Sequence, residues 1–383
     1  MKIAILVPHL FIGDEFLSKV IFSPGRLVRY LLAGLVELGH QVTLYAPISV
    51  NTPARLVLAD DSFLRAELDR RGYNLLELLK KHPLTCITLA RQLQSELVST
   101  CYQHANRGDH DLVHVYCNEE ELAMVMAQYC QSATLFNHHE PFNFLLKYRS
   151  VFPKYQHLPW VSFSKSQQQT LSSRANFVVN IPHGIPDHEY VFSATSQDYV
   201  VYLGRIIEPK GVHYAIQAAI NTGIKLKIAG KHYSQTGKDD YWQRMVKPYL
   251  DHPLIEYLGY IHRIEHKQQL LAGATALIMP STWSEPFGVV MIEALACGTP
   301  IIGFNQGSIP EVVEDQRTGF VVAFDESDRV ENLSRAIGQL SQINRHHCRQ
   351  SFEQRFTSQQ MVKRYHQTYL QQLESHRSSA GSK

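Results

Sequence analysis

Two glutamates eight residues apart, Glu285 and Glu293, are the side chains whose spacing most constrains the chemistry of this sequence. If both were helical, they would lie roughly 12 Å apart along the helix axis. That separation exceeds the ~5–9.5 Å of a glycosidase carboxylate pair, and it suits one elongated ligand that is held at both ends. The alternative interpretation is a buried helix that carries two solvated glutamates.

The residues between the two glutamates predict a helix start that can bind an anion. Pro286 stands where a first helical residue is expected, and 287–296 is mostly apolar and helix-forming. The N–H groups of Phe287, Gly288 and Val289 would then be donors at a helix N-terminus, where phosphate groups bind. Gly288 would let a ligand approach the backbone closely. Hydroxyl groups at both ends and a phosphate in the middle describe a nucleotide sugar.

Arg205 and Lys210 form a second candidate site. They follow a predicted buried strand, 199–203, and precede a helix that begins at Val212. A guanidinium group can contact two phosphate oxygens at once, and a lysine adds a mobile positive charge. The pair therefore predicts a cationic clamp, and the alternative is two cations on the protein surface.

The segment 281–307, with SEPFGVVMIEALACGTPIIG at its centre, resembles the Glu-x7-Glu segment of retaining glycosyltransferases of family 4. The resemblance is specific over 199–322 and generic over the first half of the chain. It implies an α/β protein of GT-B architecture, in which two Rossmann-like, doubly wound parallel-sheet domains face a cleft. It also implies a C-terminal helix that crosses back to the first domain.

The length of 383 residues is sufficient for two domains. We expect an N-terminal, acceptor-side domain over 1–190 and a nucleotide-sugar donor domain over 191–357. A helix over 358–374 would return to the first domain, and the small polar residues 375–383 would form a disordered tail.

The resemblance implies a role for each candidate residue of the donor domain. Arg205 and Lys210 would hold the donor diphosphate and neutralise it as it leaves, which a transferase without a metal motif requires. Glu285 would bind the sugar hydroxyls, and Glu293 the ribose diol. The other expected donor-binding residues are Gly204, Lys231, Ile261, Arg263, Phe287, Gly288 and Val289.

The first domain contributes two further candidates. The family has a glycine-rich loop after its first strand, where this sequence offers Gly25 as a phosphate contact, or as no more than a turn before the helix 26–38. His139 follows a predicted strand, and the resemblance implies that it approaches the donor sugar. His138 is the rival for that role, and a loop histidine without a ligand is the third interpretation. The expected catalytic set is His139, Arg205, Lys210 and Glu285.

Composition excludes several classes of function. With 44% apolar and 19% charged residues the chain resembles an ordinary soluble globular protein, and its net charge of +2 gives no case for nucleic acid. The sequence lacks the ~20-residue apolar run of a membrane span, which leaves peripheral membrane contact open. The opening MKIAILVP is too short for a signal peptide. The six cysteines are scattered, which indicates a reducing cytoplasm and no metal site.

Together these patterns predict a metal-independent, retaining hexosyltransferase (EC 2.4) without a cofactor. Its co-substrate would be a UDP-sugar or GDP-sugar, and its acceptor a carbohydrate, a lipid-linked molecule or a small molecule. The alternatives are a GT-B phosphorylase, a sugar-nucleotide epimerase and a non-catalytic sugar-nucleotide-binding protein.

The hypothesis that Glu285 and Glu293 hold the two ends of one ligand is testable by truncating each glutamate. Glu293→Ala should weaken binding of the free nucleoside diphosphate, whereas Glu285→Ala should weaken binding of the complete sugar nucleotide alone. We expect losses of roughly tenfold or more, since a hydrogen bond to a charged group contributes about 1.5–3 kcal/mol. Calorimetric titration with both ligands measures the change in affinity that each substitution causes. Equal effects of the two variants on both ligands would contradict the hypothesis.

Overall fold

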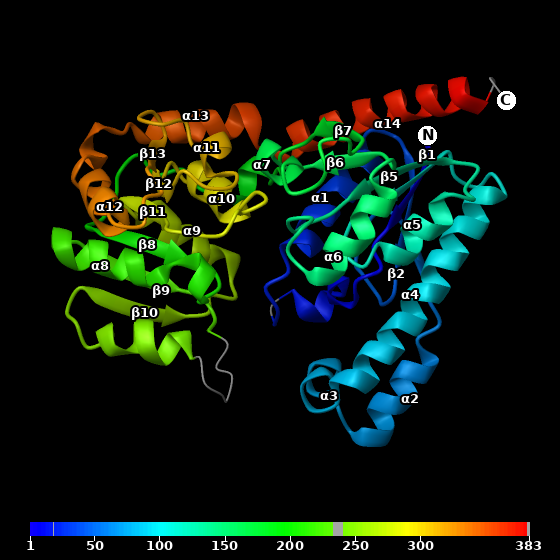
Figure 1. Ribbon diagram of the computed structural model, residues 1–383, viewed down its shortest axis with the longest axis horizontal. Helices are drawn as coiled ribbons and strands as arrows, with labels where there is room; N and C mark the ends of the chain where they lie inside the picture. The colour runs from blue at the N-terminus through cyan, green and yellow to red at the C-terminus, as the bar shows by residue number, and fades with distance from the viewer. Residues whose placement is uncertain (18, 233–239, 381–383) are drawn as a thin grey trace. The chain divides into compact units, whose positions relative to one another are not determined.

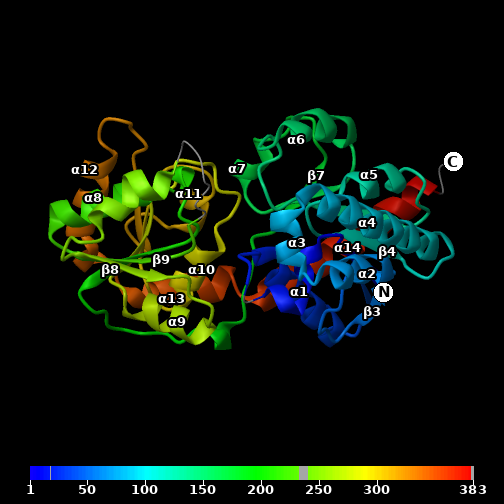
Figure 2. The same cartoon turned by 90° about the horizontal axis from the view of Figure 1, so that it is seen from below.

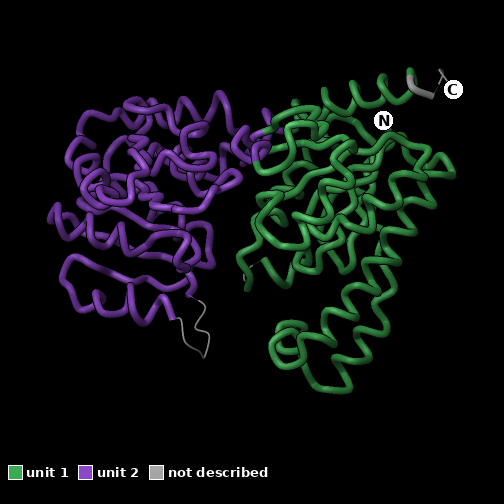
Figure 3. The backbone as a smooth tube through the Cα atoms, viewed as in Figure 1, with its two compact units in different colours: residues 1–162, 170–181, 362–383 green, residues 163–169, 182–361 purple. Residues whose placement is uncertain are grey.

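The computed structural model describes residues 1–17, 19–232 and 240–380, and the chain forms two compact units (Figure 3). Unit 1 comprises Met1–Ser162, Thr170–Ile181 and Val362–Lys383, and unit 2 comprises Phe163–Gln169 and Pro182–Met361. The last three residues of the predicted tail, 381–383, lie outside the described residues. The remainder of that tail, 375–380, is helical rather than disordered.

The units divide earlier than the predicted boundary after residue 190. Residues 182–190 group with unit 2, because their backbone is bonded there. The N–H of Gly184 donates to Met361 Sδ (3.3 Å), and the N–H of Ile185 donates to the Phe356 carbonyl (3.0 Å).

Unit 1, whose C-terminal helix is drawn in red in Figure 1, is built on a seven-stranded parallel sheet. The strand order of this sheet is β3-β2-β1-β4-β5-β6-β7. Its strands are mostly buried on both faces, which is typical of parallel sheets covered by helices. The strands are β1 Lys2–Leu6, β2 Gln41–Ala46, β3 Arg55–Leu58, β4 Leu112–Val115, β5 Ala133–Asn137, β6 Trp160–Ser162 and β7 Phe177–Asn180. β3 was not predicted, since the pattern of residues 50–108 is largely helical.

Helices cover both faces of the unit 1 sheet. α4 and α5 pack on the face that carries Val113 and Val115, and α14 packs on the face that carries His114. The helices of this unit are α1 Ser23–Glu37, α2 Ser62–Arg71, α3 Leu75–Lys81, α4 Pro83–Asn106, α5 Glu121–Ala127, α6 Leu146–Val151 and α14 Ser358–Ala380 from Val362 onward.

The C-terminal helix α14 packs on α1, as predicted. A Cβ atom on Gly34 of α1 would lie 2.5 Å from Val362, so the two helices approach closely at this glycine. Beneath α14, His114 Nδ1 lies 2.7 Å from the Tyr369 hydroxyl. At the edge of the same contact, His40 Nε2 lies 2.9 Å from His366 Nδ1. These polar contacts align α14 on the sheet.

Unit 2 is built on a six-stranded parallel sheet in the order β10-β9-β8-β11-β12-β13. In Figure 2, α8 and α12 lie on one side of this sheet, and α9, α10 and α13 lie on the other. The strands are β8 Tyr199–Leu203, β9 Lys225–Ala229, β10 Ile255–Gly259, β11 Ala276–Met279, β12 Ile301–Phe304 and β13 Gly319–Val322. The helices are α7 Lys165–Gln168, α8 Val212–Thr222, α9 Ile264–Gly273, α10 Val289–Ala296, α11 Ile309–Val312, α12 Arg329–Gly338 and α13 Arg345–Arg355.

Within residues 1–17, 19–232 and 240–380, none of the helices combines the length and the hydrophobicity that crossing a bilayer demands.

Both sheets are doubly wound, so the predicted α/β fold class is confirmed. The strand order reverses between β1 and β4 in unit 1 and between β8 and β11 in unit 2. Ligands of open parallel sheets bind outside the carboxyl ends of the strands at such a reversal. The arrangement of the two units about a cleft stays a prediction.

Lowering the pH should weaken the packing of α14 on the rest of unit 1. The pKa of His40 lies below its ordinary value of 6.5, because of burial first and then the N-terminal amine and His366. A histidine with a depressed folded-state pKa contributes stability that is present above pH 6.5 and is lost as the pH falls through the folded-state value. We therefore expect the melting temperature to be lower at pH 5 than at pH 7.5.

The variant His366→Asn should lose less stability than the wild type over the same pH range, because one imidazole is gone from the pair. His157→Asn, at an exposed position, is the matched control. Parallel pH dependence in the wild type and His366→Asn, followed by circular dichroism, would contradict the assignment.

Candidate active site

The carboxyl ends of β8 and β11 lie side by side at the strand-order reversal of unit 2. Arg205 and Lys210 follow β8, and the segment 281–288 follows β11. The two connections are bonded to one another, since the N–H of Thr282 donates to the Pro209 carbonyl (2.9 Å). The fold therefore brings both predicted motifs to the carboxyl ends of these two strands, where open parallel sheets have their ligand-binding crevice.

Lys210 and Glu285 form an ion pair across this crevice. Their side chains are only 14% and 15% exposed, so neither charge is well solvated. The Lys210 ammonium group also lies 5.7 Å from the centre of the Trp283 ring. Removing either partner would leave the other charge half-buried and uncompensated, which is costly.

Arg205 borders the same crevice. Its carbonyl accepts a hydrogen bond from the Tyr202 hydroxyl (2.6 Å), and its side chain is half-buried. The pKa of Tyr202 lies well above its ordinary value, raised first by burial and then by Tyr241 and Glu285, and lowered in turn by Arg205. Within the described part of the chain, the Arg205 guanidinium makes no ion pair, in contrast to Lys210.

The segment that carries Glu285 is held by the turn after β12. The N–H of Ser308 donates to the Glu285 carbonyl (2.9 Å), and the Ser308 hydroxyl donates to the Phe287 carbonyl (2.7 Å). A Cβ atom on Gly307 would lie 2.4 Å from the Glu285 nitrogen. The backbone on either side of the carboxylate is therefore fixed.

The helix after Glu285 starts later than predicted. α10 begins at Val289, with Gly288 as its N-cap at a φ of 77°. Phe287 precedes the helix, so its amide is not one of the helix N-terminal donors, and the donors are those of Val289 and its successors. The left-handed turn at Gly288 delays the start, and Pro286 lies in the loop before it.

Glu293 lies in the second turn of α10 and is 5% exposed. Its Oε1 accepts a hydrogen bond from the Tyr190 hydroxyl (2.7 Å) and pairs with Lys267 of α9. Neither partner was identified from the sequence, because each lies far along the chain from Glu293 and belongs to no recognisable motif.

The other candidates of unit 2 lie at the ends of β8, β9 and β10. Gly204 adjoins the turn after β9, and the N–H of Ile206 donates to the Lys231 carbonyl (3.0 Å). Ile261 is half-buried in the loop after β10. Arg263 caps α9, and its side chain is 72% exposed and lies 3.5 Å from Glu265. The structure groups Gly204 and Lys231 with the crevice, whereas Arg263 points to solvent.

The two histidine candidates of unit 1 differ in burial. His138 is fully buried, with Nδ1 2.6 Å from Glu120 Oε1 and its ring against Phe142 and Tyr148. His139 is half-buried, and its Nε2 donates to the Tyr116 carbonyl (2.7 Å). Burial lowers the pKa of His139 to about 3, so its ring is neutral at pH 7. Burial favours His139 over His138 as a ligand contact, and that contact stays a prediction.

Gly25 lies at the start of α1 rather than in the loop before it. It is in the first turn of α1, is buried, and its N–H donates to the Phe22 carbonyl (3.2 Å). The helix starts at Ser23, with Pro24 in its first turn, rather than at the predicted residue 26. The predicted helix start is wrong because the favoured position of proline in a first helical turn was overlooked, and a contact of Gly25 with phosphate stays a prediction.

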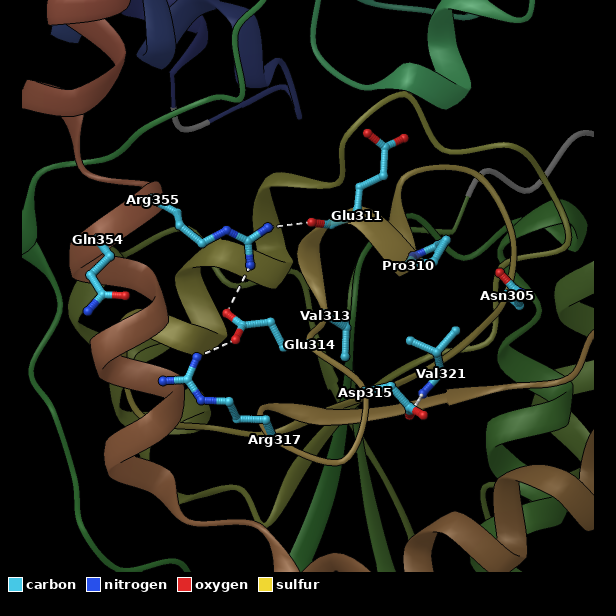
Figure 4. A pocket seen from close by; sticks show the side chains of 10 residues that line it. All are labelled: Asn305, Pro310, Glu311, Val313, Glu314, Asp315, Arg317, Val321, Gln354 and Arg355. Atoms are coloured by element: carbon cyan, nitrogen blue, oxygen red, sulfur yellow. Dashed lines mark hydrogen bonds and ion pairs between the residues drawn. The ribbon is translucent and has the colours of Figure 1, made fainter.

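A pocket of about 730 Å³ lies beside the edge strand β13 (Figure 4). Three of its charged side chains are paired with one another, since Glu314 accepts hydrogen bonds from Arg317 and Arg355. Burial raises the pKa of Glu314, but hydrogen bonds from Ser351 and Arg317 outweigh it and hold the pKa below its ordinary value. None of the predicted site residues lines this pocket, which we interpret as a structural network.

Among the described residues, no group of three or more histidine, cysteine, aspartate or glutamate side chains is arranged to hold a metal ion.

Solved structures share the fold over nearly the whole chain. Sucrose-phosphate synthase from Thermosynechococcus elongatus has a TM-score of 0.73 at 18% identity, and the match covers 98% of this chain and 100% of that one. Alr3699/HepE of Anabaena, in complex with UDP, has a TM-score of 0.67 at 17% identity, covering 96% and 99%. The chain therefore has the GT-B fold of glycosyltransferases, as the resemblance predicted.

Sequence comparison locates the family within unit 2. Glycogen synthase of Mycobacterium tuberculosis H37Rv is 32% identical over 150 residues, which are 36% of this chain and 34% of that protein. The chain thus matches about a third of the length of its curated relatives. Residues 187–355 match the sequence pattern of the Glycosyl transferases group 1 family, so the similarity to that family lies in unit 2.

The ion pair across the crevice should show strong coupling. Lys210→Met and Glu285→Gln should each destabilise the ligand-free protein, and the double variant should be less destabilised than their sum. For residues in direct contact we expect a coupling of about 1–3 kcal/mol. Urea unfolding of the four proteins measures it.

The exposed pair Lys225–Glu256, whose side chains are 45% and 39% exposed, is the matched control. Its coupling should be about 0–1 kcal/mol. Additive effects of Lys210→Met and Glu285→Gln would show that the two side chains do not stabilise the protein through their interaction.

Proposed function

We propose that the chain is a retaining hexosyltransferase that transfers a sugar from a nucleoside-diphosphate sugar to an acceptor hydroxyl. The observation that carries this proposal is the convergence of Lys210, Glu285 and Arg205 with the start of α10 at one strand-order reversal. Cations, backbone donors and a carboxylate in one crevice match the phosphates and hydroxyls of such a donor.

In the proposed reaction, the bond between the anomeric carbon and the diphosphate oxygen breaks, and the acceptor oxygen bonds to the same face of that carbon. The acceptor proton leaves with the diphosphate. Arg205 and Lys210 stabilise the negative charge that develops on the leaving group. Glu285 binds sugar hydroxyls, Glu293 binds the ribose diol, and no side chain acts as a covalent nucleophile.

Two cations at the diphosphate can supply the charge compensation that a divalent metal supplies in other transferases. We therefore propose a metal-independent reaction. The donor is proposed to be a UDP-sugar, since the structurally similar Alr3699/HepE was crystallised with UDP and with UDP-glucose.

A panel of UDP-, GDP- and ADP-sugars tests the donor class in a thermal-shift experiment. One donor should raise the melting temperature by several degrees, because binding at 100 times Kd stabilises by about 2.7 kcal/mol. Arg205→Ala and Lys210→Ala should each abolish most of the shift and lower turnover by orders of magnitude.

A chelator should leave turnover unchanged, and lost activity that Mg²⁺ or Mn²⁺ restores would contradict metal independence.

Single-turnover assays separate the transferase from a non-catalytic sugar-nucleotide-binding protein. A binding protein gives the thermal shift but forms no glycoside and does not hydrolyse the donor. A phosphorylase would carry pyridoxal phosphate on a lysine, which the absorbance spectrum of the purified protein would reveal. An epimerase would convert the donor without an acceptor. Unchanged turnover in the Arg205 and Lys210 variants would remove the clamp from the mechanism.

A further inference from the structure

The carboxylate of Glu293 is held by two side chains that come from other parts of unit 2. Tyr190 follows the short 3-10 helix 187–189, and Lys267 belongs to α9. Both reach the same oxygen, Oε1, the first by a 2.7 Å hydrogen bond and the second as an ion pair. Three separate elements therefore meet at one carboxylate oxygen.

All three side chains are largely removed from water. Tyr190 is 2% exposed, and the side chains of Lys267 and Glu293 are 17% and 6% exposed. The Lys267 ammonium also lies 5.9 Å from the centre of the Tyr190 ring. In such surroundings a carboxylate is retained only where it is paired and hydrogen-bonded.

The backbone behind Tyr190 is anchored independently of Glu293. Arg349 of α13 donates to the Tyr190 carbonyl (3.0 Å) and to the Ala296 carbonyl at the end of α10 (2.9 Å). The Tyr190 hydroxyl is thus presented to Glu293 from a fixed position, which restricts the rotamer of the carboxylate.

We propose that Tyr190 and Lys267 are positioning residues that orient Glu293 toward the ribose diol of a nucleoside diphosphate. This inference rests on the proposed function, in which Glu293 accepts hydrogen bonds from that diol. It adds two residues that would determine how well the site distinguishes ribonucleotides from 2′-deoxyribonucleotides.

The reason is the asymmetry of hydrogen-bonded recognition. A fixed acceptor binds a ligand more tightly when that ligand carries the matching hydroxyl. It binds a ligand without the hydroxyl more weakly, because the buried acceptor is then left without a hydrogen bond. A carboxylate free to rotate would bind the diol less well and would tolerate its loss. The quantity that reports positioning is therefore the ratio of the Kd of a 2′-deoxyribonucleoside diphosphate to that of the ribonucleoside diphosphate.

Calorimetry on the full chain with UDP and 2′-deoxy-UDP, and in parallel with GDP and 2′-deoxy-GDP, measures this ratio. We expect the wild type to prefer the ribonucleotide by roughly tenfold or more, as a hydrogen bond to a charged group implies. Tyr190→Phe and Lys267→Met should each reduce the ratio severalfold, and Lys267→Arg should restore most of it. Glu293→Gln should reduce the ratio furthest.

Matched controls distinguish positioning from loss of stability. Tyr199→Phe removes another buried tyrosine hydroxyl, which donates to the Leu270 carbonyl (2.8 Å), and Lys225→Met removes a lysine paired with Glu256. Both controls should keep the wild-type ratio, whatever their melting temperatures. Loss of the ratio in the controls to the same extent would overturn the proposal, because the effect would then be general.

The outcomes separate this inference from the proposed function. If Glu293→Gln abolishes the ribose preference while Tyr190→Phe and Lys267→Met retain it, the positioning role is wrong and the role of Glu293 stands. If the wild type binds UDP and GDP no better than their 2′-deoxy forms, the ribose role of Glu293 and its positioning both fail. If neither UDP nor GDP binds at all, the proposed function also fails.

Discussion

Close backbone contact at the strand ends of unit 2 is the constraint on which its candidate site depends. A Cβ atom on Gly211 would lie 2.0 Å from the Pro280 carbonyl oxygen, and one on Gly230 would lie 1.8 Å from the Gly204 carbonyl oxygen. Gly211 also has a φ of 69°, which side-chain-bearing residues rarely adopt. These contacts draw the connections after β8, β9 and β11 together. The positions of Arg205, Lys210 and Glu285 follow from them.

The two ion pairs explain how such a site persists without a ligand. Glu285 is paired with Lys210 and Glu293 with Lys267, so each buried carboxylate has a cation beside it. The pairs are not equivalent in the proposed reaction. A diphosphate carries more charge than a carboxylate and can draw Lys210 away from Glu285, which frees Glu285 for sugar hydroxyls. Lys267 has no such competitor, because the ribose is neutral, and it therefore suits a positioning role.

The sequence predicted the fold well where local patterns and tertiary packing agree. The strand 199–203 was predicted with the bounds that β8 has, and Arg205 and Lys210 were correctly expected between it and the helix that begins at Val212. Errors arose where a single residue decides the local structure. The φ of 77° at Gly288 delays α10 by two residues, and Pro24 brings Gly25 into α1. Tyr190 and Lys267 escaped prediction because pairing with Glu293 is a product of tertiary packing alone.

The polarity of α10 connects the candidate site to the stability of unit 2. Its N-terminus faces the crevice, and its C-terminal carbonyls face the interior, where a second helix end, that of α9, converges with them. The side chain of Arg345 lies between these two helix ends, and the residue is 8% exposed. It donates to five acceptors, all of them neutral: the carbonyls of Ser193, Ala272, Ala274 and Cys297, and the Thr299 hydroxyl.

A buried guanidinium with neutral acceptors is stable here because helix C-termini carry partial negative charge. Arg345 thus neutralises the ends of α9 and α10 that point away from the proposed donor site, while their side chains Lys267 and Glu293 pair with one another. The opposite end of α10 keeps its partial positive charge directed at the crevice. One helix therefore serves both requirements: its C-terminus is satisfied by side chains of the protein, and its N-terminus is where we propose that the donor phosphate binds.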